Sequence, residues 1–168
     1  MSNAVTMYEY HAWANQTMLN RLKELPQDVY KQEIVSIFPS VSKGMAHIYT
    51  VDRSWLEIVT GTEMKDAMGL AEQVTKEAER QSIEELQAMF AALSERYRAF
   101  FREQPDLEKA IVLDNPYAGI RETRLSEIVM QVVNHGTYHR GNISAMLRQM
   151  GHASVMTEYA LFWYQNRA

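Results

Sequence analysis

Apolar residues recur at steps of three and four along four long segments of this chain, the spacing of one face of an α-helix rather than of a strand. Four such amphipathic helices, each roughly 30 Å long at 1.5 Å per residue, predict an all-α fold built as a four-helix bundle. The predicted helices run from about Ala4 to Leu25, from about Ser40 to Thr60, from Ser82 towards Pro105, and from about Arg124 to Met150.

Local signals mark the ends of these segments. Ser82 and Glu85 form a capping-box pattern, in which each side chain accepts a hydrogen bond from a free amide of the first turn. Pro39 suits a first helical turn, whereas Gly61 and Gly151 suit C-terminal caps. The helix boundaries are therefore predicted by local chemistry as well as by periodicity.

The connections between the helices differ in length. The first is short, whereas the links at 61–81 and 104–123 are long enough to cross the end of a bundle. Within the second long link, the apolar run 110–113 and the turn-forming run 115–119 predict a short β-hairpin or an extended flap. The aromatic segment 159–163 is expected to form a short C-terminal helical segment against the bundle.

Composition excludes several classes of protein. The 168 residues contain no cysteine, so disulfides, a thiolate nucleophile and cysteine-bound metals are ruled out. The net charge is −4 with scattered basic residues, which argues against a nucleic-acid partner. Apolar stretches fall short of the roughly 18 residues of a membrane span, and Glu9 lies where a signal peptide would be apolar. We expect a single cytoplasmic domain, residues 1–168, with no membrane partner.

Histidines are the candidate chemical groups. His135 and His139 lie one turn apart on the core side of the last predicted helix, and His47 lies at the edge of the apolar stripe on the second. Two imidazoles at this spacing can bind one cation, but a hydrogen-bonded core pair fits the same pattern. Zinc-protease and di-iron motifs are missing, since neither His-Glu-x-x-His nor Glu-x-x-His occurs. His11 is expected to be a boundary residue and His152 a loop residue, and neither receives a role.

Three ordered segments resemble the DinB-like family of metalloenzymes: Tyr8–Asn15, His47–Leu56 and Asn134–Gly151. The resemblance implies a four-helix bundle in up-down-down-up order with long crossover connections. It also implies a divalent metal held by three histidines, which in this sequence are His47, His135 and His139.

Two residues depart from the family pattern. Many relatives have a histidine at the position of Gln131 and a glutamine at that of Asn142. Neither is among the three implied ligands. Both could alter the pocket, so the reaction of a particular relative is not transferred to this chain.

Three neutral imidazoles leave a metal with an open coordination position, as in catalytic rather than closed structural sites. Some members of the family use a small thiol such as bacillithiol or mycothiol. The resemblance therefore implies a metal-dependent transferase with a low-molecular-weight thiol substrate. A metal-dependent hydrolase and a non-catalytic, stress-related metal-binding bundle are the alternatives. Zn²⁺ is the expected ion and Ni²⁺ the second choice. The catalytic residue is unknown, and the family resemblance implies a homodimer.

Asp52 and Arg140 are candidates to support the ligands. Asp52 lies near the middle of an apolar stripe, where an ionised carboxylate is costly unless it is paired. We expect it to bond a residue of another helix, such as Asn15 or Arg140, and a structural ion pair is favoured over a catalytic role. Arg140 follows His139 and could contact an anionic substrate or Asp52. Tyr138 is expected at the surface or in an interface.

Overall fold

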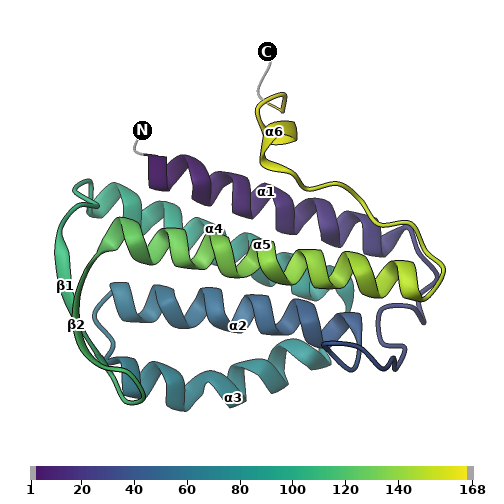
Figure 1. Ribbon diagram of the computed structural model, residues 1–168, viewed down its shortest axis with the longest axis horizontal. Coiled ribbons are helices and arrows are strands. Elements are labelled where there is room, and N and C mark those ends of the chain that lie inside the picture. The colour runs from purple at the N-terminus through teal and green to yellow at the C-terminus, as the bar shows by residue number, and fades with distance from the viewer. Residues whose placement is uncertain (1–2, 166–168) are drawn as a thin grey trace.

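A computed structural model describes residues 3–165 of the protein, which is mostly helical with one small sheet (Figure 1). The elements in chain order are α1 (Asn3–Lys23), α2 (Val41–Val59), α3 (Met64–Arg80), α4 (Ile83–Glu103), β1 (Ala110–Asn115), β2 (Gly119–Arg124), α5 (Leu125–Gln149) and α6 (Tyr159–Phe162). Four of the helices, α1, α2, α4 and α5, correspond to the four segments predicted from periodicity.

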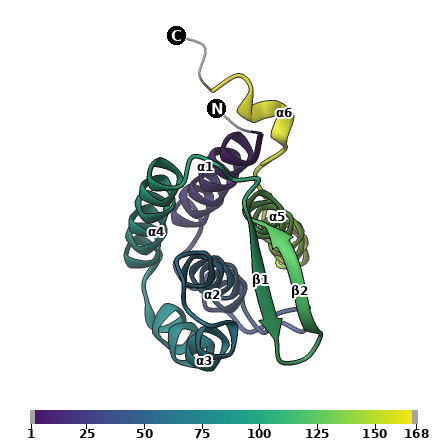
Figure 2. The same ribbon diagram turned by 90° about the vertical axis from the view of Figure 1, so that its left-hand side faces the viewer.

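These four helices surround the main core. Helix α1 contacts α4 and α5, and α2 contacts the same two helices from the other side; the end-on view shows this arrangement (Figure 2). The core is filled by apolar side chains that are fully buried, including Met18, Leu19, Met45, Ile48, Leu86, Ile143 and Met146. Each such side chain contributes about 1.5–3 kcal/mol by leaving water, so this core fixes how the helices lie against one another.

The predicted caps are present. The Ser82 hydroxyl accepts the Glu85 amide at 3.1 Å, and the Glu85 carboxylate accepts the Ser82 amide at 2.8 Å. Gly61 and Gly151 end their helices with positive φ, at 111° and 84°. Pro39 lies before the helix rather than in its first turn, because Ser40 is the N-cap of α2.

The link at 61–81 is not a plain connection, since it contains helix α3, which packs along α2. Its buried residues are Met64, Ala67, Val74 and Ala78. Two of the four are alanines, which give a weak apolar signal beside the many charged residues of the helix. For that reason the periodicity did not predict it.

The all-α expectation is wrong, because β1 and β2 form an antiparallel pair in register from Ala110 and Arg124 to Asn115 and Gly119. Of the two predicted alternatives for this link, the hairpin is confirmed and the extended flap is not. The Asn115 side chain accepts the amides of Tyr117 and Ala118. These bonds close the turn, and the hairpin lies across one end of the helices (Figure 2).

The predicted C-terminal helical segment is confirmed as α6, which contacts α1. The Tyr10 hydroxyl donates to the Thr157 carbonyl at 2.8 Å. The rings of Tyr159 and Phe162 lie 5.1 and 6.0 Å from that of Tyr10. Across residues 3–165, every helix is too short or too polar to span a membrane.

Candidate metal centre

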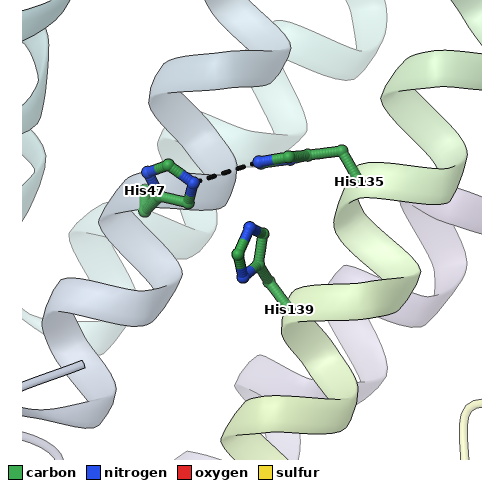
Figure 3. A group of neighbouring side chains, drawn as sticks. All are labelled: His47, His135 and His139. Atoms are coloured by element: carbon green, nitrogen blue, oxygen red, sulfur yellow. Dashed lines mark hydrogen bonds between the residues drawn. The ribbon is translucent and has the colours of Figure 1, made fainter. Parts of the chain in front are cut away.

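The three histidines singled out from the sequence meet between two helices (Figure 3). His47 comes from α2, while His135 and His139 come from successive turns of α5. One ring nitrogen of each lies within 4.8 Å of those of the other two. Nε2 of His47 and Nε2 of His135 are only 3.0 Å apart. The structure thus brings together all the residues proposed as ligands.

A glycine beside the site lets the two helices approach. Gly44 lies three residues before His47 and is buried. A Cβ added there would lie 3.1 Å from both Ile143 Cγ1 and Phe38 Cδ2. That spacing is tighter than ordinary van der Waals contact, so the Ile143 and Phe38 side chains would have to move by a few tenths of an ångström to admit even a methyl group.

The site keeps its imidazoles neutral. Burial, together with the neighbouring His139 and His47, lowers the pKa of His135 to about 3. Burial likewise lowers the pKa of His47 and of His139. Neutral imidazoles each keep one lone pair for a cation, and protons do not compete for it near pH 7.

This donor set fits a divalent metal. Nitrogen ligands of a tetrahedral zinc ion, at 2.0–2.1 Å from the metal, lie about 3.3 Å from one another. The separations here, from 3.0 Å to less than 4.8 Å, are close to that value. His47 and His135 share one N–H···N hydrogen bond between their Nε2 atoms, and a cation bound between the three rings would replace it.

Aromatic rings and an amide border the site. The half-buried Phe38 ring lies 5.4 Å from the ring of His47 and 5.2 Å from that of His139. Tyr138 is 63% exposed, as expected for the surface, yet its ring meets His139 edge-on at 5.0 Å. The Asn142 side-chain nitrogen lies 3.2 Å from His139 Nδ1. One of the two departures from the family pattern therefore contacts a candidate ligand.

The residues expected to support the ligands lie in a buried polar cluster. Asp52 does bond another helix, but its partner is His11, whose Nε2 lies 2.6 Å from Asp52 Oδ2. Neither Asn15 nor Arg140, the partners expected from sequence, bonds Asp52 in residues 3–165; Arg140 instead donates to Asn15 Oδ1 at 2.8 Å. Arg140 is 1% exposed, so it does not reach a substrate in the surrounding solvent.

His11 is the residue that sequence reasoning missed. It is 1% exposed at the centre of α1 rather than at a boundary. The signal was present, because a stripe with three- and four-residue steps runs through Tyr8, His11, Asn15 and Met18, all of them buried. His152 follows α5, and its backbone amide donates a hydrogen bond to the Leu147 carbonyl near the end of that helix.

Comparison with known proteins agrees with these observations. The model of the DinB family matches residues 1–167. Protein DinB of Bacillus subtilis is 48% identical over 164 residues, which cover 98% of this chain and 95% of that protein. The crystal structure of a DinB-like protein from Bacillus cereus is similar with a TM-score of 0.64 and 18% sequence identity. That similarity covers 91% of this chain and 94% of the other, and it concerns the fold alone.

Proposed function

The chain belongs to the DinB family, and we propose that it binds one divalent metal ion through His47, His135 and His139. The observation that carries the proposal is the convergence of three neutral imidazoles from two helices, with one nitrogen of each within 4.8 Å of the others. Zn²⁺ is our first choice and Ni²⁺ the second, because imidazole suits both.

We propose further that the site is catalytic and serves a transferase that uses a low-molecular-weight thiol. An ion held by three neutral imidazoles would keep an open coordination position and stabilise an anionic oxygen or sulfur nucleophile at neutral pH. The chain has no cysteine, so any reacting sulfur must belong to the cosubstrate. Among residues 3–165, no carboxylate joins the three-histidine group.

The bordering residues have separate tasks in this proposal. Phe38 packs against His47 and His139 and keeps water from that side of the rings. The Asn142 amide, beside Nδ1 of His139, helps to hold the orientation of that ring. Tyr138, exposed beside the same histidine, offers an aromatic surface to a substrate.

Two alternatives of different kinds remain: a metal-dependent hydrolase and a non-catalytic, stress-related metal-binding bundle. We also propose that α1, α2, α4 and α5 form the up-down-down-up bundle of the family within a single domain, residues 1–168. Their mutual contacts around one core support this arrangement. The cytoplasmic location and the homodimer stay predictions.

Metal titration tests the proposed site. Protein purified without a nickel column and stripped with a chelator is titrated with Zn²⁺ and with Ni²⁺ by calorimetry. We expect one ion per chain. His47→Gln and His139→Gln should each weaken binding by more than the roughly 100-fold that loss of a ligand's hydrogen-bond partner can cost. His152→Gln, outside the cluster, should bind as wild type. Wild-type protein that binds neither ion would refute the proposal.

Activity assays separate the three functions. The metal-loaded and metal-free forms are incubated with an electrophile and a panel of small thiols, and in parallel with ester and amide probes. Metal-dependent conjugation supports the transferase, and metal-dependent cleavage supports the hydrolase. Loaded protein that is inert in every assay supports the binding bundle.

A further inference from the structure

A second polar cluster lies in the interior, apart from the three histidines. It joins His11 and Asn15 of α1 to Asp52 of α2 and Arg140 of α5, and each of the four is at most 2% exposed. A buried carboxylate and a buried guanidinium are costly unless both are bonded. Such a cluster therefore constrains the three helices that supply it.

His11 is the bridge between the two charges. Its Nε2 lies 2.6 Å from Asp52 Oδ2, and its Nδ1 lies 3.2 Å from Arg140 Nη1. A guanidinium can only donate, so Nδ1 accepts and the ring proton resides on Nε2, from which it is donated to Asp52. A neutral His11 thus links cation to anion, and in residues 3–165 no direct hydrogen bond joins Arg140 to Asp52.

Asn15 completes the cluster from the same helix. Its side-chain oxygen accepts from Arg140 Nη1 at 2.8 Å. Its side-chain nitrogen lies 2.9 Å from His11 Nε2, but both groups carry protons in this arrangement, so this is a packing contact rather than a hydrogen bond. The other guanidinium nitrogen, Nη2, donates to the Thr137 hydroxyl at 2.9 Å, within α5. Arg140 is therefore held from α1 and from its own helix at once.

Gly136 shows how closely His11 approaches α5. A Cβ added at this glycine would lie 2.6 Å from His11 Nδ1 and 2.9 Å from Arg140 Nη1, and closer still to His11 Cε1. The imidazole therefore occupies the space that any other residue would need. Gly136 lies between the two histidines of α5, so His11 packs directly against the backbone segment that carries both of them.

The cluster touches both helices that carry the candidate ligands. Gly136 follows His135, Arg140 follows His139, and Asp52 lies on α2 five residues after His47. Helix α1, which supplies His11, provides none of the three. We infer that His11 is a positioning residue: it bridges Asp52 of α2 to Arg140 and Gly136 of α5, and so holds the three metal-site imidazoles facing one point. This inference rests on the proposed metal site.

Metal binding by His11 variants tests this positioning role. His11→Phe keeps the ring volume but makes no hydrogen bond to Asp52 or Arg140. His11→Gln keeps an N–H that reaches the place of Nε2. We expect His11→Phe to weaken Zn²⁺ binding roughly 10- to 100-fold, the range for partners that orient a ligand. It should also change the visible absorption spectrum of bound Co²⁺, and His11→Gln should recover part of both losses.

A matched control separates positioning from general destabilisation. Leu86→Ala creates a cavity on α4, which carries none of the three histidines, so it should lower stability but keep the Zn²⁺ affinity and the Co²⁺ spectrum of wild type. If His11→Phe does not fold, His11→Asn decides in its place, because its shorter amide can face Arg140 but not reach Asp52. We expect His11→Asn to weaken Zn²⁺ binding roughly 10-fold.

The outcomes are distinct. A folded His11→Phe or His11→Asn with wild-type affinity and spectrum would overturn the positioning role and leave the metal site standing. Equal losses in Leu86→Ala would also overturn it, since the effect would then follow stability alone. Wild-type protein that binds neither Zn²⁺ nor Co²⁺ would overturn the proposed function itself.

Discussion

Substitution of Gly136 by alanine tests the packing of His11 against α5. Alanine in place of glycine inside a helix gains about 1 kcal/mol from propensity alone. Here, however, the new methyl group would lie 2.6 Å from His11 Nδ1. Overpacking of this kind costs about 1–3 kcal/mol, and a displaced ring also loses its bond to the Asp52 carboxylate, about 1.5–3 kcal/mol. We expect Gly136→Ala to destabilise the protein by about 1.5–5 kcal/mol.

The effect of Gly136→Ala on stability should change from destabilising to neutral or stabilising when the His11 ring is absent. In a His11→Ala background, the methyl group meets mainly Arg140 Nη1, at 2.9 Å, which is the end of a flexible side chain. The propensity gain then remains, so adding Gly136→Ala should be neutral or stabilise by up to about 1 kcal/mol. The four proteins of this double-mutant cycle should show a coupling energy of about 3 kcal/mol, at the upper end for residues in contact.

Urea unfolding of the four proteins measures the cycle. The proteins are stripped of metal, because a bound ion would add its own stabilisation to the folded state. Gly141→Ala, on the same helix with open space around the glycine, is the matched control and should stabilise by up to about 1 kcal/mol in either background. A coupling energy below about 0.5 kcal/mol, the range for independent sites, would refute the close packing of His11 on Gly136.

Three further predictions concern the fold and the charge state of the site. Tyr97→Phe removes a buried hydroxyl that donates to the Asp52 carbonyl at 2.7 Å. It should cost about 1–3 kcal/mol in urea unfolding, and an unchanged midpoint would contradict the bond. Ser82→Ala removes the cap that accepts the Glu85 amide and should cost about 1 kcal/mol, with thermal unfolding as the check. The pKa of His135 is lowered to about 3 in the fold, whereas the unfolded side chain titrates near 6.5. The unfolded chain therefore binds the extra proton, so metal-free stability relative to His135→Gln should fall as the pH drops from about 6.5 towards 3; a pH-independent difference in urea midpoint would contradict this.

Much of the helical part of the fold could be predicted from the sequence. The caps at Ser82 and Gly151 depend on residues close in the chain, so the sequence alone carries that information. Helix α3 escaped prediction because Ala67 and Ala78 form half of its buried face. The hairpin was predicted only as one of two alternatives, since its turn chemistry at Asn115 is local but its pairing is not.

The candidate site likewise has one part that local sequence predicts and another that depends on contacts between distant segments. The spacing of His135 and His139 on one helix is local, and the resemblance to the DinB-like family added His47. The partner of Asp52 was predicted wrongly because it depends on how three helices approach one another. His11 was expected to be a boundary residue with no role, and the glycine that makes room for it lies 125 positions away in the sequence. Contacts of that range follow from packing rather than from pattern.

Anomalous X-ray scattering from a crystal of the protein, purified without a nickel column and soaked in Zn²⁺, tests the metal site most directly. We predict one strong anomalous peak per chain, at about 2.0–2.1 Å from a ring nitrogen of each of His47, His135 and His139, with density for a further ligand on its open side. Absence of a peak between these three rings, or zinc bound only elsewhere on the surface, would contradict the assignment.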